Sequence, residues 1–169
     1  MKAGEENDYS VFQCWGRSFT GTAYLIDQIR GKWEAPELLA QARAFWFKHK
    51  STGTSMLRAM RIEDKASGTG LIQTLRREGI SIVPVQRNTD KVSRGYDAAP
   101  YFEAGNVFLP IDAPWLSDFL PEVSGFPGAA NDDQCDPLFD AVNEVQSAQT
   151  SINSNPVRVI PVQNTFARR

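Results

Sequence analysis

Histidine and cysteine are scarce in this sequence of 169 residues, which contains one histidine and two cysteines. A histidine-rich metal site and a Ser-His-Asp triad therefore have little support, because the only histidine, His49, stands between two lysines at the polar end of an expected helix. Cys14 and Cys135 lie far apart and fit neither a CxxC metal knuckle nor a disulfide framework. We expect two reduced thiols, as is usual in a cytoplasmic protein.

Long apolar runs and a strong charge of either sign are absent as well. No apolar run approaches the ~20 residues of a membrane span, and the polar opening Met1-Lys2-Ala3-Gly4-Glu5-Glu6-Asn7-Asp8 is not a signal peptide. The net charge of −2 does not indicate nucleic-acid binding by the protein surface as a whole, so such binding would depend on local patches of basic residues. A hydrophobic fraction of 41% with 22% charged residues is typical of a soluble globular protein.

The order of the expected elements predicts an α/β domain with a mixed sheet. Residues rich in β-branched and aromatic side chains predict an antiparallel hairpin over 10–17 and 22–30. The remaining patterns predict strands ending at Glu63, over 80–85 and at the edge over 106–110, and helices over 35–50, 68–78, 90–103, 114–122 and 131–145. We expect one domain over 1–146 and a tail over 147–169.

Two acidic stretches stand out. Glu63 and Asp64 come at the end of a predicted strand, before a glycine-bearing turn, and open α/β sheets bind their ligands at the carboxyl ends of strands. Further along, acidic residues repeat every four positions: Asp132, Asp136, Asp140 and Glu144. On one helix face, like charges at this spacing destabilise the helix by about 0.2–0.5 kcal/mol per pair.

Two explanations of these acids remain open from spacing alone. The second stretch fits capping acids at the start of a helix, followed by a solvated face. Alternatively, the two clusters converge to bind a divalent metal through carboxylate oxygens. A pair of such ions about 4 Å apart can activate water and stabilise the leaving oxygen in phosphodiester cleavage.

Five motifs give the sequence a resemblance to a known family. They are Asp8-Tyr9-Ser10-Val11, the run from Tyr24 to Trp33, Ile62-Glu63-Asp64-Lys65-Ala66-Ser67-Gly68, Asp90-Lys91-Val92-Ser93-Arg94 and Asn131-Asp132-Asp133-Gln134-Cys135-Asp136. In this order, from about Asp8 to Asn143, they resemble the nuclease domain of the tailed-phage terminase large subunit. The resemblance implies an RNase H-like fold, a mixed sheet flanked by helices, and metal-dependent DNA cleavage during the packaging of viral DNA into capsids.

The resemblance also implies the roles of individual residues. Glu63 and Asp132 would be the catalytic acids and would bind Mg²⁺ or Mn²⁺. The neighbouring acids would be further metal ligands: Asp64, Asp133 and Asp136. Basic residues would contact DNA phosphates: Lys65, Lys91 and Arg94. The implied partners are double-stranded DNA, the portal and the small terminase subunit in the cytoplasm of a bacterial host, with no membrane.

The sequence departs from the family at its start. In the family, a metal-binding aspartate lies on the first strand, several residues before the Asp-Tyr pair that Asp8-Tyr9 matches, and this strand is central in the sheet. Neither that strand nor the family's ATPase domain has a counterpart here, so we expect a fragment of a longer terminase or a degraded prophage copy. Asp27 could substitute as a ligand, although a structural role in the second hairpin strand is the expectation.

Three functional readings follow from this departure. The chain is a nuclease domain, or a catalytically silent remnant that binds DNA or packaging partners without cutting, and whether it is an enzyme is left open. A resolvase or transposase with the same fold is a third reading, which the Asp90-Lys91-x-x-Arg94 element argues against.

Overall fold

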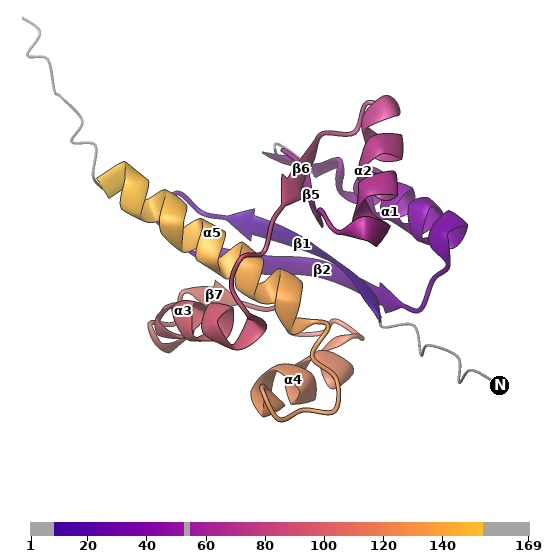
Figure 1. Ribbon diagram of the computed structural model, residues 1–169. Helices are drawn as coiled ribbons and strands as arrows, with labels where there is room; N and C mark the ends of the chain where they lie inside the picture. The colour runs from indigo at the N-terminus through magenta and orange to yellow at the C-terminus, as the bar shows by residue number, and fades with distance from the viewer. Residues whose placement is uncertain (1–8, 53–54, 154–169) are drawn as a thin grey trace, which may run out of the picture.

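The computed structural model describes residues 9–52 and 55–153, and it confirms the predicted α/β class (Figure 1). The elements in chain order are β1 (Ser10–Arg17), β2 (Ala23–Gly31), α1 (Ala35–His49), β3 (Ser51–Thr52), β4 (Ser55–Met56), β5 (Met60–Glu63), α2 (Ala66–Arg77), β6 (Ile82–Val85), α3 (Lys91–Glu103), β7 (Val107–Phe108), α4 (Leu116–Gly125) and α5 (Cys135–Asn153). None of the helices in these two ranges is both long enough and apolar enough to cross a membrane.

The strands form two main pairings. The predicted hairpin is confirmed: β1 and β2 pair antiparallel, with a bulge between Cys14 and Trp15, and β7 joins β2 in parallel. Separately, β5 and β6 pair in parallel, from Met60 opposite Ile82 to Glu63 opposite Val85. Among the described strands, β1 is hydrogen-bonded to β2 alone, and β5 is hydrogen-bonded to β6 alone. The family's central strand, expected between them, is not among the described residues.

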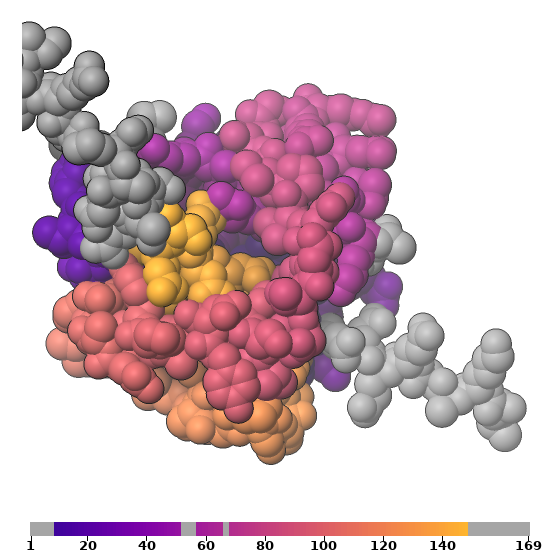
Figure 2. All heavy atoms as spheres, turned by 60° about the vertical axis from the view of Figure 1, so that its left-hand side comes forward, coloured from indigo at the N-terminus to yellow at the C-terminus, as the bar shows by residue number. Residues whose placement is uncertain are grey.

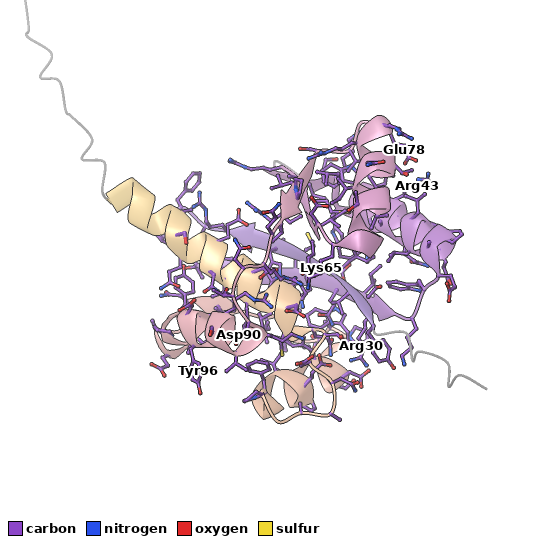
Figure 3. The ribbon with its side chains drawn as sticks, in the orientation of Figure 1. Arg30, Arg43, Lys65, Glu78, Asp90 and Tyr96 are labelled. Atoms are coloured by element: carbon purple, nitrogen blue, oxygen red, sulfur yellow. The ribbon has the colours of Figure 1, made fainter. Side chains whose placement is uncertain are left out.

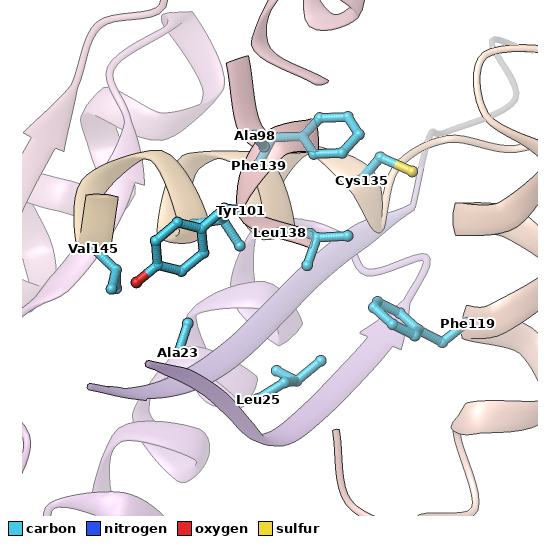
Figure 4. Close-up of a cluster of buried hydrophobic side chains, with 10 residues drawn as sticks. Ala23, Leu25, Ala98, Tyr101, Phe119, Cys135, Leu138, Phe139 and Val145 are labelled. Carbon is cyan, nitrogen blue, oxygen red and sulfur yellow. The ribbon is translucent and has the colours of Figure 1, made fainter. Parts of the chain in front are cut away.

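Helices cover both faces of the hairpin. In Figure 1, α5 crosses one face of β1 and β2, while α1 lies with α2 on the other side, near β5 and β6. Ala23 and Leu25 of β2 point into the core beneath α5, together with Leu138 and Val145 (Figure 4). Completely burying a leucine of this kind stabilises the fold by about 1.5–3 kcal/mol.

A second core lies between α1, α2 and the β5–β6 pair. Trp46 of α1 packs there with Ile72 and Leu75 of α2 and with Ile82 of β6. Phe12 of β1 packs against the same cluster from the hairpin. The β5–β6 pair is therefore joined to the rest of the fold through side-chain packing and the helices.

Two local predictions were wrong. The last helix continues to Asn153 and enters the segment that we expected to be a tail, because no glycine or proline interrupts the chain after Val145 until Pro156. His49 was expected to be a solvated helix terminus, yet its side chain is only 11% exposed and its Nε2 lies 2.8 Å from Asp27 Oδ2. Asp27 also accepts a hydrogen bond from Lys48 and thus has the structural role expected of it.

Both thiols are free, as expected, and both are buried. Burial raises the pKa of Cys14 to about 11 and that of Cys135 to about 12, and nearby carboxylates act in the same direction. Since the thiolate is the reactive form of cysteine, these two side chains are inert core residues.

Candidate functional site

Glu63 is fixed at the carboxyl end of β5 by the close approach of α2. The Asp64 amide donates a hydrogen bond to the Val85 carbonyl, which continues the β5–β6 pairing past Glu63. A Cβ at Gly68 would lie 2.1 Å from the Glu63 carbonyl oxygen, so a glycine is required at this point of contact. The glycine after the acidic pair therefore lets the first turn of α2 pack onto the end of the strand.

The acids of the second stretch lie at the start of α5. Asp132 stands in the turn before the helix, where the Cys135 amide donates to its carbonyl. Asp136 and Asp140 follow on one helix face, one turn apart, while Glu144 pairs with Arg61 at the surface. Pro137 is accommodated because it lies in the first turn, where its missing N–H has no intrahelical partner.

One arginine connects the strand end to this helix. Arg87, in the connection between β6 and α3, donates from Nη1 to Glu63 Oε2 at 2.6 Å. Its Nε and Nη2 donate to Asp140 Oδ2 at 2.9 and 2.7 Å. The other Glu63 oxygen lies 2.6 Å from Lys65 Nζ, and Arg94 Nη1 donates to Asp140 Oδ1 at 2.7 Å. Both oxygens of each carboxylate are therefore paired with cations.

The same pattern continues toward the start of α5. Arg94 Nη2 donates to Asp136 Oδ1, and Lys91 Nζ lies 2.8 Å from Asp136 Oδ2. Lys91 Nζ also donates to Asp132 Oδ1 at 2.6 Å. Four carboxylates and four cations thus alternate in one chain of ion pairs, which we call the charge ladder: Lys65, Glu63, Arg87, Asp140, Arg94, Asp136, Lys91 and Asp132.

The ladder favours the charged forms of Asp136 and Lys91. Burial alone raises the pKa of Asp136, but hydrogen bonds from Lys91 and Arg94 outweigh it and hold that pKa below its usual value. Burial alone lowers the pKa of Lys91, but hydrogen bonds to Asp132 and Asp136 outweigh it and raise that pKa. The cations therefore remove the like-charge repulsion that the four-residue spacing of the acids would otherwise create.

Helix α3 brings two of the cations to α5. The Asp90 side chain caps the helix by accepting from the Ser93 amide at 2.9 Å. At Gly95, a Cβ would lie 3.0–3.2 Å from ring atoms of Phe126 and Phe139, so the two helices approach closely at this residue. This packing places Lys91 and Arg94 against the acids of α5.

A buried network of amides fixes the turn that contains Asp132. Gln134 is 1% exposed, and its amide nitrogens, main-chain and side-chain, donate to the two Glu122 oxygens at 2.7 and 2.6 Å. Its side-chain oxygen accepts from Gln28 at 2.5 Å, and Gln28 accepts in turn from Gln13 at 2.7 Å. The network connects β1, β2 and α4 to the start of α5. Nothing in the sequence pattern indicated it.

The predicted site residues are only partly brought together. Glu63, Asp132 and Asp136 belong to the charge ladder, and Asp133 lies in the turn beside Asp132. Asp64 instead accepts from the Thr69 hydroxyl at 2.9 Å, at the start of α2. Among the three residues predicted to contact phosphates, Lys65 has the most exposed side chain, at 72%. Figure 3 labels it. The side chains of Lys91 and Arg94 are 22% and 11% exposed and face carboxylates.

Sequence reasoning missed Arg87. It follows the strand β6, which runs parallel to β5, and the carboxyl ends of parallel strands meet at one edge of a sheet. That topology was the one available signal for placing it beside Glu63. Asp140 was noted as part of the acidic repeat, but it was not assigned to the site.

The carboxylate oxygens are the ligand type that Mg²⁺ prefers. Their arrangement, however, does not fit the ion: over residues 9–52 and 55–153, no three acidic, histidine or cysteine side chains are grouped so that they could hold a metal. The oxygens that would have to coordinate it are already paired with arginine or lysine.

A groove runs beside the ladder. It encloses about 430 Å³ and is lined by residues of β5, α3 and α5, among them Arg61, Arg94, Asp140 and Glu144. Part of α5 is visible in Figure 2 between α3 and the chain around β6. The inner members of the ladder are thus reached from solvent along this side of α5.

Comparisons with known proteins agree with the observed fold. The family model described as the terminase RNaseH-like domain matches residues 2–145. The crystal structure of the large terminase nuclease from the thermophilic phage G20c, with bound magnesium, superposes with a TM-score of 0.56. That match has 19% sequence identity and covers 85% of this chain and 78% of the phage chain, so it shows a shared fold. A search of curated proteins found no match.

Proposed function

Because the chain belongs to the terminase RNase H-like domain family, we propose that it acts in DNA packaging as a nuclease domain directed at the backbone of double-stranded DNA. The observation that carries this proposal is that Arg87 bridges Glu63, at the end of β5, to the acids Asp136 and Asp140 of α5. Two separate elements deliver acids to one edge of the sheet, where this class of fold binds its ligands.

We propose that cleavage is metal-dependent and uses Mg²⁺ or Mn²⁺, with Glu63 and Asp132 as the essential acids. Asp64, Asp133 and Asp136 are the additional ligands in this proposal. A bound divalent ion would supply activation of water and stabilisation of the leaving oxygen. The ladder as described leaves no carboxylate pair free for an ion, so this role belongs to an arrangement in which the ladder has opened.

Contacts to DNA would come first from the exposed end of the ladder. Lys65 is the most exposed of the proposed phosphate contacts. Lys91 and Arg94 would be available only after release from Asp132 and Asp136. Backbone contacts position a protein on DNA without reading its sequence, so we propose binding with little base preference. The portal and the small terminase subunit are the proposed protein partners, in the cytoplasm of a bacterial host.

A second candidate function is supported by a specific observation. Both oxygens of Glu63, Asp136 and Asp140 face cations. An acidic cluster neutralised in this way suits a catalytically silent domain that binds DNA or packaging partners without cutting.

The experiment that separates the two candidates is nicking of supercoiled plasmid in Mn²⁺ or Mg²⁺, with gel-shift binding measured on the same samples. The variants are Glu63→Ala and Asp132→Asn, and the control is Arg43→Met, which removes an ion pair with Glu78 between α1 and α2 (Figure 3). Nicking lost in both site variants and kept in the control supports the nuclease. Binding without nicking by the wild-type chain supports the silent domain. Nicking that survives in Glu63→Ala would sink the assignment of the acids, and absence of both nicking and binding would sink both candidates.

A further inference from the structure

We propose that residues 157–160, which follow α5 in the chain, dock as a β-strand between the free edges of β1 and β5 of their own molecule and join the two sheets into one. The inference concerns how the sheet is completed, and it holds whether or not the domain cuts DNA. It assigns a role to the C-terminal segment, residues 154–169, which the candidate site does not use.

The free edges of β1 and β5 lie in one layer between helices. Neither edge has a hydrogen-bonded neighbour among the described strands. On one face, β1 packs against α5, and Arg61 of β5 pairs with Glu144 of the same helix. On the other face, Phe12 of β1 and Ile62 of β5 pack against one cluster of α1 and α2 side chains. A strand between β1 and β5 would therefore be covered on both faces, as inner strands of a sheet are.

The backbone of β1 favours such an addition. The strand is eight residues long, and seven of them are buried or half-buried. An unpaired edge presents a row of N–H and C=O groups that can bind a further strand. Because buried backbone groups need hydrogen-bond partners, an edge enclosed by helices is stabilised when a strand pairs with it.

Side-chain contacts along α5 determine the direction of a docked strand relative to β5. Arg61 pairs with Glu144, and one arginine bridges Glu63 to Asp140, so β5 runs opposite to α5. A chain that turns back after Asn153, the last residue of α5, therefore runs parallel to β5.

The hairpin gives the direction relative to β1. Gln28 contacts Gln134 before the start of α5, whereas Ala23 lies in the same core cluster as Val145, so β2 also runs opposite to α5. Since β1 is antiparallel to β2, the returning chain would be antiparallel to β1. Parallel pairing with β5 and antiparallel pairing with β1 are both regular hydrogen-bond patterns.

The length of the chain after α5 fits this path. Asn153 lies nine positions after Glu144, which is a rise of about 13 Å along the helix at about 1.5 Å per residue. An extended chain covers this distance in about four residues, at about 3.3 Å per residue. The residues that arrive beside Arg61 are therefore those from about position 157 onward.

The sequence of the segment matches each part of the path. Ser154-Asn155-Pro156 is typical of a turn. The run Val157-Arg158-Val159-Ile160 contains three β-branched apolar residues, which suit a strand covered on both faces. Its one charged residue arrives close to Glu144, whose side chain is 46% exposed. Pro161 has no N–H to continue the pairing, so it ends the run.

Hydrogen–deuterium exchange of the full chain, measured by mass spectrometry, tests the docking. The variant is Val159→Pro, which removes a donor from the middle of the proposed strand. The matched control is Thr165→Pro, in the same segment but outside the strand. Val159→Ala is the milder variant and serves as the test if Val159→Pro does not fold. Circular dichroism shows which variants are folded, and light scattering gives the oligomeric state.

The proposal predicts that peptides of β1 and β5 exchange at least about tenfold faster in Val159→Pro than in the wild type and in Thr165→Pro, with a smaller increase in Val159→Ala. The wild type should be a monomer when it shows this protection. Equal exchange in the wild type and a folded Val159 variant would overturn the inference. Protection that appears only when a dimer forms would also overturn it, because the strand would then come from a second copy. Neither result bears on plasmid nicking, so the proposed function is tested separately.

Discussion

The most direct energetic consequence of the ladder is the cost of removing Arg94. This arginine is the most buried cation of the ladder, with an 11% exposed side chain, and it pairs with both Asp136 and Asp140. Breaking a buried pair by removing one partner destabilises a protein by about 3–5 kcal/mol. The two carboxylates keep Lys91 and Arg87 as partners and are about 20% exposed, so we expect a loss of about 2–4 kcal/mol for Arg94→Met.

The assay is urea unfolding followed by circular dichroism, in EDTA so that no metal contributes. A loss of about 3 kcal/mol corresponds to a decrease in Tm of roughly 6–12 °C for a domain of this size. Arg43→Met is the control, because Arg43 and Glu78 are exposed and their pair is expected to contribute nothing measurable. A double-mutant cycle with Asp136→Asn should give a coupling energy of about 1–3 kcal/mol. The reasoning would be refuted if Arg94→Met were no more destabilising than the control.

Three further predictions concern the supports of the site. Gly68→Ala should destabilise the fold by about 1–3 kcal/mol in urea unfolding, because its Cβ would meet a backbone oxygen; Gly70→Ala, with open space around it, should not. Gln134→Leu leaves buried polar partners unpaired and should cost about 2–4 kcal/mol, so a loss below 1 kcal/mol would contradict the network. The pKa of Asp136 in the folded protein is lower than its ordinary value of 3.8, so this carboxylate contributes stability above pH 3.8 that is lost as the pH falls through the folded-state pKa. Asp136→Asn removes this titration, and its stability should therefore depend less on pH in acid unfolding curves. Curves with the same pH dependence as those of the wild type would contradict this.

The sequence was informative wherever a local pattern determines structure. The richness in β-branched and aromatic residues predicted the hairpin of β1 and β2. The position of Glu63 at the end of a strand was also predicted correctly, because a strand followed by a glycine-bearing turn and a helix is a short-range signal.

The parts that were missed depend on contacts between distant residues. Arg87 reaches Glu63 and Asp140, which are 24 and 53 positions away in the chain. Such pairing requires the parallel arrangement of β5 and β6 and the packing of α3 on α5, and no local pattern specifies these together. His49 was misjudged for the same reason: a lysine on each side suggested solvent, but its partner, Asp27, lies on another element.

The measurement that tests the central claim most directly is a crystal structure of the wild-type chain grown with Mn²⁺, with the ion located by its anomalous signal. The account predicts a Mn²⁺ ion coordinated by Glu63 together with a carboxylate of α5 or of the turn before it, with the side chain of Arg87 turned away from Glu63. Absence of Mn²⁺ from these acids at millimolar concentration, with Arg87 still bridging Glu63 and Asp140, would contradict it and favour the silent domain.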